Sequence, residues 1–288
     1  MRTKKELERE FATYQILASL THTYEDIALS RMQEIRKSVL VTREFLTGVE
    51  KVYLLAKASF FYEISHVAGK RKREKELEFV RRNRKTVVVL VSGNQSLLGN
   101  IVLDAYRVFF DLIHKITCDK VILGTIGRYL AKSARPNFEF TYFDFDDWNT
   151  NDVIIKPVCD FISKYEKILV VYPRFDSVLR QLPQIDDISG GVRLETAKPS
   201  KKYFFEPSAR EVMSYFEGQI ISTLFKQKML ESMLARYAAR LTVMDHGSEA
   251  IEKLINKNRH DYLVASRRLE NRKLQDMFAG LSLWEEGF

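Results

Sequence analysis

The chain has 288 residues, 45% of them apolar and 29% charged, which is the balance of a soluble protein with a buried core rather than of a disordered chain. Its 12 glycines and 6 prolines are about half the usual share, which excludes collagen-like and short-stranded all-β architectures and favours long elements. Most of the net charge of +8 comes from residues 69–85, where nine Lys/Arg and three Glu give +6. The two cysteines, Cys118 and Cys159, are too few for a disulfide framework and indicate a reducing compartment.

The first sixty residues carry apolar side chains at heptad spacing. The two series that start at Leu7 and Phe11 and step by seven hold thirteen apolar residues in sixteen positions. Such a seam predicts one long helix of a left-handed coiled coil. Its proposed seam residues include Leu7, Tyr14, Met32, Ile35 and Leu46.

The middle of the chain changes to short apolar runs that alternate with helical patterns. Strands are expected at 86–92, 120–124, 138–144, 167–172 and 202–206, and helices at 101–116, 126–133 and 152–165. Several of the strands are apolar throughout, which is typical of a mainly parallel sheet covered on both faces. The fold class is therefore predicted as α/β with a Rossmann-like domain.

From about residue 208 to 282 a second long helix is expected. Ser208 is its predicted N-cap, with Glu211 at capping-box spacing. Its seam includes Leu234, Leu241 and Met244.

Two long helices at opposite ends of the chain predict an antiparallel coiled coil around an inserted domain. The expected division is a helix at 1–68, a basic linker at 69–85, the α/β domain at 86–206 and a helix at 207–288.

The sequence offers two candidate binding sites, one for a phosphate and one for a metal ion, and in both cases a purely structural role is favoured. The loop 92–100 after the first strand is placed like a phosphate-binding loop, but it lacks the glycines and lysine of such loops, so a tight structural turn is favoured. The acids in 144–147 suggest a metal site, yet no histidine accompanies them, and a solvated strand end is favoured. We therefore expect no catalytic residue, no cofactor and no metal in this chain.

Several short motifs, in order along nearly the whole chain, resemble the gamma subunit of F-type ATP synthases. The N-terminal part, with Lys5-Glu-Leu, Ala12-Thr-Tyr-Gln15, Leu20-Thr21 and Ile27-Ala-Leu-Ser-Arg-Met32, is similar to the start of that family. The loop Ser92 to Gly99, Phe175 with Gln181-Leu-Pro183, and Phe205-Glu-Pro207 resemble its middle. Glu231, Ala238-Ala-Arg240, Met244 and Gly280 resemble its last helix.

This resemblance implies a coiled coil around a Rossmann-like domain, acting as the central-stalk rotor that couples proton or sodium flow to ATP synthesis or hydrolysis. The implied partners are the alpha and beta subunits, an epsilon subunit and a membrane c-ring, and nucleic acid is not among them. In the family the end of the last helix touches the beta subunits. Here the matching contacts are expected to be Arg31, Arg267, Arg268, Arg272 and Lys273.

In that segment the family's pattern Asn-x-x-Arg-Gln-x-x-Ile-Thr-x-Glu is replaced by Leu263, Ser266, Arg267, Glu270, Asn271 and Lys273. Ser266 and Arg267 thus stand where the family has its arginine and glutamine, so the chain is a divergent member. The alternative function is a non-catalytic coiled-coil adaptor that binds nucleic acid through 69–85. The start of the sequence has no signal-peptide core and no apolar run is long enough to span a bilayer. With the resemblance, this places the chain on the cytoplasmic face of the membrane as a peripheral subunit.

Overall fold

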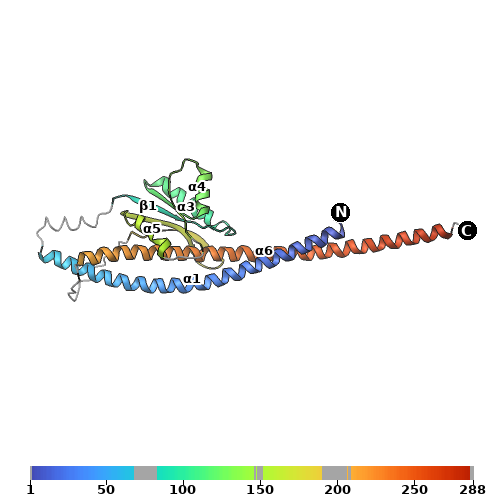
Figure 1. Cartoon of the computed structure of the whole chain (residues 1–288), viewed down its shortest axis with the longest axis horizontal. Coiled ribbons are helices and arrows are strands. Elements are labelled where there is room, and N and C mark those ends of the chain that lie inside the picture. The colour runs from blue at the N-terminus through green and yellow to red at the C-terminus, as the bar shows by residue number, and fades with distance from the viewer. Residues whose placement is uncertain are drawn as a thin grey trace. The chain divides into compact units, whose positions relative to one another are not determined.

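The computed structural model describes residues 2–67, 83–145, 147, 152–189, 206 and 209–285 (Figure 1). The long helices α1 (Lys4–Val67) and α6 (Ala209–Glu285) lie at the two ends of the sequence. Between them come α3 (Ile101–Lys115), α4 (Thr125–Ala134) and α5 (Asp152–Ile162). Residues 69–82 of the expected basic linker, the strand expected at 202–206 (apart from residue 206) and the predicted cap Ser208 lie outside the described residues.

A five-stranded sheet forms in the middle of the chain, in the order β3-β2-β1-β4-β5. Its strands are β1 (Thr86–Val91), β2 (Asp119–Leu123), β3 (Thr141–Phe143), β4 (Lys167–Phe175) and β5 (Gln181–Asp187). The first four pair in parallel, and β5 pairs antiparallel with β4. This confirms the predicted α/β class. The third strand is shorter than expected, and β5 was not expected because its sequence, QLPQIDD, is mostly polar.

Pro183 closes the outer edge of β5. It lies directly opposite Pro173 of β4 in the register. Since neither residue has an N–H to donate to the other, this is a non-hydrogen-bonded pair, in which the backbone nitrogens point away from each other. The nitrogen of Pro183 therefore faces the outer edge, where proline is tolerated and offers no donor to a further strand.

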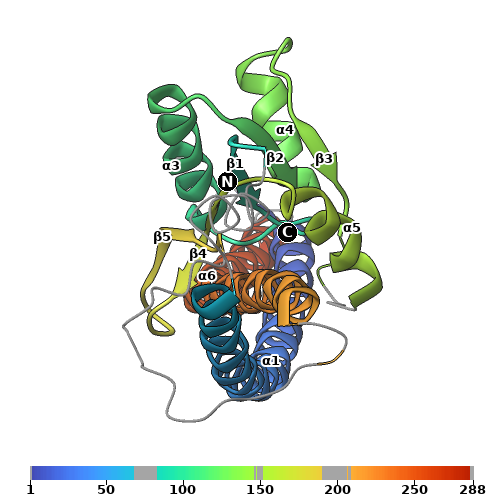
Figure 2. The same ribbon diagram turned by 90° about the vertical axis from the view of Figure 1, so that its left-hand side faces the viewer.

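The sheet is covered on both faces, as predicted (Figure 2). On one face, α5 and the first half of α6 bury apolar side chains against Val87, Val89 and Val91 of β1. On the other face, α3 and α4 pack against Val88 and Leu90 of the same strand. Alternate residues of β1 thus enter opposite cores. The first half of α6 is therefore one of the helices that cover the sheet of the α/β domain.

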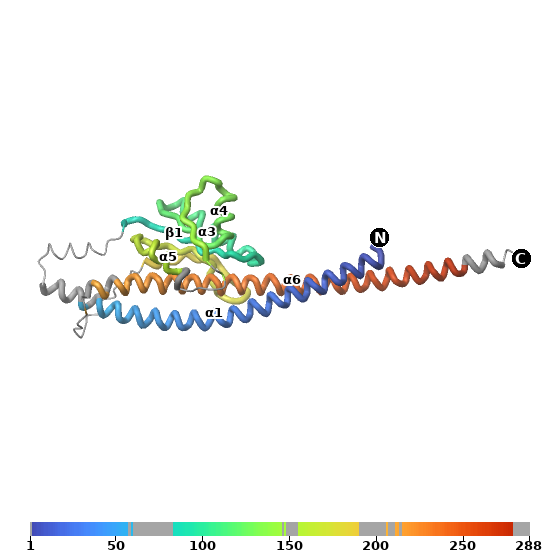
Figure 3. The backbone as a smooth tube through the Cα atoms, in the orientation of Figure 1, coloured from blue at the N-terminus to red at the C-terminus, as the bar shows by residue number. Residues whose placement is uncertain are grey.

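Two compact units are described separately. One comprises Met1–Ala28 with Leu241–Phe288, and the other comprises Leu29–Arg240. Both long helices pass through both units, and Figure 3 traces their backbones.

In each unit the two helix segments pair in antiparallel directions. In the first, Tyr262 donates a hydrogen bond to Glu8 at 3.2 Å and Asn258 donates to Glu10 at 3.2 Å. In the second, the Tyr53 hydroxyl donates to Glu217 at 2.9 Å.

The expected seam residues lie on the inner faces of these pairs. Leu7, Met32, Ile35, Leu46, Leu234 and Met244 are buried, and Tyr14 and Leu241 are half-buried. In the second unit, Leu46 belongs to a cluster with Val49, Tyr53, Ala56 and Ile220.

A charge in this seam should destabilise the chain. Leu46→Asp places an unpaired carboxylate at a side chain that is 8% exposed, so we expect the free energy of unfolding to fall by about 2–5 kcal/mol. Leu241→Asp, in the other unit and only half-buried, should cost less. The matched control is Leu40→Asp on α1, where the side chain is 59% exposed and a change within about 0.5 kcal/mol is expected. Denaturant titration measures all three, and equal effects of Leu46→Asp and Leu40→Asp would contradict the seam.

Candidate functional site

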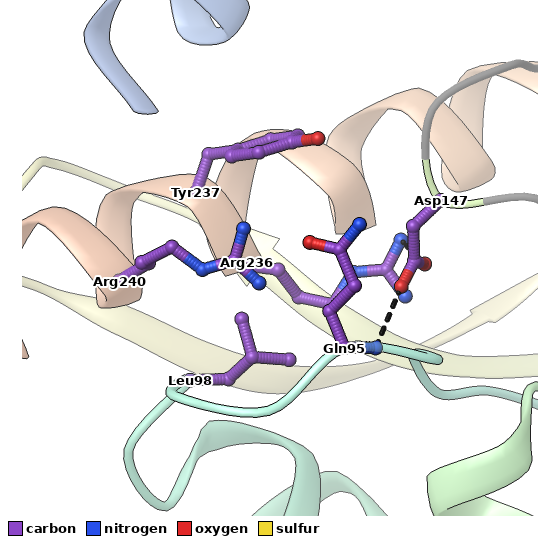
Figure 4. Close-up of a pocket in the computed structure, with 6 residues that line it drawn as sticks. All are labelled: Gln95, Leu98, Asp147, Arg236, Tyr237 and Arg240. Atoms are coloured by element: carbon purple, nitrogen blue, oxygen red, sulfur yellow. Dashed lines mark hydrogen bonds and ion pairs between the residues drawn. The ribbon is translucent and has the colours of Figure 1, made fainter. Parts of the chain in front are cut away.

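A buried ion pair fixes α6 to the loops of the α/β domain. Arg236 of α6 is 4% exposed, and its Nη2 lies 3.1 Å from Oδ1 of Asp147, which is 6% exposed. The other guanidinium nitrogen, Nη1, donates to the backbone carbonyl of Ser92 at the end of β1. The guanidinium also lies 5.3 Å from the centre of the Phe145 ring. We call this set of interactions the Arg236 contact (Figure 4).

The two charges of the Arg236 contact depend on each other. Burial lowers the pKa of the Arg236 guanidinium, and the Asp147 carboxylate opposes this shift. Arginine does not lose its proton in proteins, so both groups stay charged. Removing one partner of a buried pair leaves an uncompensated charge, which costs about 3–5 kcal/mol.

Asp147 also holds the loop that was considered as a phosphate site. Its Oδ2 accepts the backbone N–H groups of Asn94 at 2.7 Å and Gln95 at 2.9 Å. Successive backbone N–H groups of this kind are what a phosphate uses in other proteins. Here the chain's own carboxylate takes that position, which supports the tight structural turn.

Asn94 extends the same arrangement to α4. Its side-chain Oδ1 accepts the N–H of Thr125, the first residue of α4, at 2.7 Å. Its side-chain nitrogen donates to the backbone carbonyl of Phe145. One loop residue therefore caps a helix and binds the segment that carries Asp147.

The prediction of a solvated strand end at 144–147 is wrong for Asp147, which is buried and paired, although Asp144 is exposed as expected. Among the residues that the structure describes, no group of three or more His, Cys, Asp or Glu side chains is placed to hold a metal ion.

A second polar contact joins β4 and β5 to α6, two turns before Arg236. Nζ of Lys228 lies 2.6 Å from Oδ2 of Asp186. The Tyr172 hydroxyl lies 2.8 Å from the same oxygen and 3.0 Å from Oε2 of Glu231. Burial acts to raise the pKa of Asp186, but the hydrogen bonds from Lys228 and Tyr172 outweigh it and lower that pKa. Asp186 is therefore held as a carboxylate.

Four of the five basic residues predicted from the sequence belong to one unit. Arg267, Arg268, Arg272 and Lys273 lie on one exposed stretch of α6 in the first unit. Arg31 belongs to the second unit, where it pairs with Glu34 at 2.7 Å.

The sequence analysis did not find Arg236, Asp147 or Lys228 as structural partners. The available signal was Arg236 and Arg240 standing in a run of small and apolar residues from 233 to 241, where a solvated face would be more polar. Arg236 and its partner Asp147 lie 89 positions apart in the sequence, and no local pattern connects them.

Comparison with known proteins shows which family has this architecture. A family described as ATP synthase matches residues 3–265. The ATP synthase gamma chain of Roseiflexus castenholzii is 22% identical over 88% of this chain and 89% of its own length. The gamma chain of Neisseria gonorrhoeae is 22% identical over 97% of this chain and 99% of its own.

Solved structures agree with the fold. A chain of the central stalk and c-ring of Tetrahymena thermophila mitochondrial ATP synthase aligns with a TM-score of 0.59, covering 80% of this chain and 99% of that chain at 14% identity. A chain of the Euglena gracilis mitochondrial enzyme aligns with a TM-score of 0.53, covering 89% of this chain and 95% of that chain.

An α/β domain fixed to a pair of long helices is thus the architecture of a central-stalk subunit. The chain belongs to the ATP synthase family, as a divergent gamma-type subunit of the rotor. The adaptor alternative is set aside. No helix in the described part of the chain has the length and apolar character needed to cross a membrane.

Breaking the Arg236 contact should destabilise the chain strongly. Arg236→Met leaves the Asp147 carboxylate buried without its cation, so we expect the free energy of unfolding to fall by about 3–5 kcal/mol. The control is Arg107→Met, which removes an ion pair of similar length, 3.0 Å, from a side chain that is 67% exposed. That change should cost no more than about 1 kcal/mol. Similar losses for both variants in denaturant titration would contradict the assignment.

The isolated chain should not bind ATP. The loop N–H groups that would meet a phosphate are already bound by Asp147, and the loop sequence carries no Gly-Lys-Ser/Thr. Isothermal titration calorimetry with ATP and Mg²⁺ should give no measurable heat of binding. Micromolar affinity for the isolated protein would be the contrary result.

Proposed function

We propose that this chain turns inside a ring of alpha and beta subunits and links the state of their catalytic sites to ion flow through a membrane c-ring. The observation that carries the proposal is the combination of an ATP synthase family match with a long helix that extends past its partner helix. The chain would act by shape and stiffness, without an active site of its own. An epsilon subunit is proposed as a further partner, and the cytoplasmic face of the membrane as the location.

The exposed end of α6 is the proposed contact with the beta subunits. α1 begins at Lys4, whose Nζ lies 5.1 Å from the ring centre of Tyr262 on α6. Residues 267–278 of α6 come after that point and are all exposed. The stretch contains Arg267, Arg268, Arg272 and Lys273, against the acids Glu270 and Asp276. Its surplus of positive charge suits an acidic surface on a partner.

Exposure also suits the way such a contact must work. A rotor has to form and release its contacts in every turn. Buried ion pairs would hold it in one position, whereas exposed pairs contribute only about 0.2–1 kcal/mol each and are weakened by salt. Arg31 is proposed as a further beta contact, from the second unit.

We expect Arg267→Ala together with Arg268→Ala to leave assembly with the alpha and beta subunits intact and to reduce ATP turnover. The loss should be largest at low ionic strength, because salt already screens these charges in the wild type.

The matched control is Lys253→Ala with Lys257→Ala, which removes two exposed positive charges from the same helix and the same unit. Both control residues precede Tyr262 in α6, so they lie in the part of the helix that is paired with α1 and outside the proposed beta contact. Turnover of the Arg267/Arg268 variant equal to that of the wild type at low salt would mean that the basic stretch is only a solvated face.

A further inference from the structure

The charged residues of the α/β domain are divided unevenly between the two edges at which its strands begin and end. β1, β2 and β4 run in parallel, so they begin at one edge, which we call the amino edge. The described loops and element ends at this edge contain five lysines, two arginines and four acids. They are residues 83–85, 115–120, 135–140, 163–167 and 187–189. We call the lysines and arginines of these ranges the basic end.

The opposite edge has the reverse balance. Among the described residues, the loops that follow β1, β2, β3 and β4 there contain three acids and one arginine, which are Asp144, Asp147, Asp176 and Arg180. Among the loops of the domain, the surplus of positive charge is thus confined to the amino edge.

The basic end lies on the side of the domain where α6 begins. At the carboxyl end of β1, the Ser92 carbonyl accepts a hydrogen bond from Arg236 of α6. At the amino edge, Ser163 instead lines a groove with Thr223 of α6. The amino edge therefore faces Ala209, the first residue of α6, and Figure 2 views the domain from that side. The other end of α6 is the proposed beta contact, so the basic end faces the c-ring and the surrounding membrane, an orientation that rests on the proposed function.

The charges of the basic end are not used in ion pairs. Within the described part of the chain, none of its seven cations pairs with an acid. Two of them lie over aromatic rings instead. Arg135 is 5.3 Å from the ring centre of Phe110, and Nζ of Lys120 is 5.3 Å from that of Phe138. A cation above a ring keeps its charge, so this edge presents positive charge that direct contacts with acids do not compensate.

The composition of the basic end does not suit a protein partner. The core of a protein–protein interface is rich in aromatic and apolar side chains and poor in lysine. Five of the seven cations here are lysines, and none of the large apolar side chains that are exposed in the described residues lies in these ranges.

Nucleic acid is not favoured either. Recognition of single strands uses free aromatic faces on which bases stack. Phe110 and Phe138 are half-buried, and a cation already lies over a face of each ring. An anionic lipid surface needs no apolar or stacking contact, because it attracts lysines and arginines by charge alone, each of which raises the binding constant about fivefold.

We propose that the basic end is a contact surface for the anionic phospholipid headgroups of the membrane. A bilayer is fluid and its charge is spread over the surface, so the attraction has no preferred angle of the rotor. The contact would hold the central stalk against the membrane without opposing its rotation.

Sedimentation of the full chain with lipid vesicles measures this contact. We expect binding to vesicles of phosphatidylcholine mixed with an equal amount of phosphatidylglycerol, and none to phosphatidylcholine alone. Added salt should weaken the binding, because it screens exposed charges. A lack of binding to the mixed vesicles at low ionic strength would overturn the proposal.

A triple variant tests which residues make the contact. Lys115→Gln with Lys164→Gln and Lys167→Gln removes three exposed charges of the basic end and should lower the binding constant for mixed vesicles by at least about tenfold. The matched control is Arg36→Gln with Lys37→Gln and Arg43→Gln, which removes three exposed charges from α1 in the same unit. It should lower the binding constant by less than about threefold. Both variants should keep the wild-type Tm, because exposed substitutions change stability little.

Equal weakening by the two variants would overturn the basic end as the site. Both leave residues 69–82 unchanged, which hold seven further Lys/Arg and three Glu and lie outside the described residues. Tighter binding of a single-stranded oligonucleotide than of mixed vesicles at the same salt would also overturn the proposal. A chain that assembles with alpha and beta subunits but does not bind vesicles overturns the membrane contact alone, whereas a wild-type chain that does not assemble with them overturns the proposed function.

Discussion

The interaction on which the α/β domain depends is the burial of one arginine against one aspartate. Charges that leave water must be paired, and here the pair also orders what surrounds it. Asp147 binds Arg236 on one side and the loop after β1 on the other. Asn94 in that loop then caps α4 and holds the segment after β3. Three loops and a long helix are thus positioned by a single buried carboxylate.

Helix α6 serves two partners in the same unit, and this explains its composition. Ile221, Phe225 and Met229 enter the core under the sheet, while Ile220 packs on α1. A helix with two buried faces has little room for polar residues, so those that remain are directional. The Arg236 contact and the contact of Lys228 with Asp186 fix the rotation of the helix relative to the sheet, which apolar packing alone leaves free to slip. For a subunit proposed to turn against a resisting load, that is the property required.

Elements with a regular apolar pattern could be predicted from the sequence, whereas contacts between residues far apart in the sequence could not. The heptad positions of α1 and the apolar runs of β1, β2 and β4 follow from periodicity, because each element reports its own burial. The strand β5 does not, because an edge strand with Pro183, two glutamines and the consecutive acids Asp186 and Asp187 has no apolar run. Asp147 was interpreted as solvated since its partner lies on a distant helix. The family resemblance predicts the exposed basic stretch of α6, but no pattern within the chain distinguishes it from an ordinary solvated face.

The proline pair at the outer edge of the sheet bears on the life of the chain before it is assembled. A gamma-type subunit is made as a separate polypeptide, and exposed strand edges are templates on which separate chains aggregate. Pro183 withholds a donor at the middle of the β5 edge, opposite Pro173. At the other edge β3 offers only three residues, Thr141–Phe143. Neither edge provides a long ladder for a foreign strand, so the domain is protected against self-association during the time in which it has no partners.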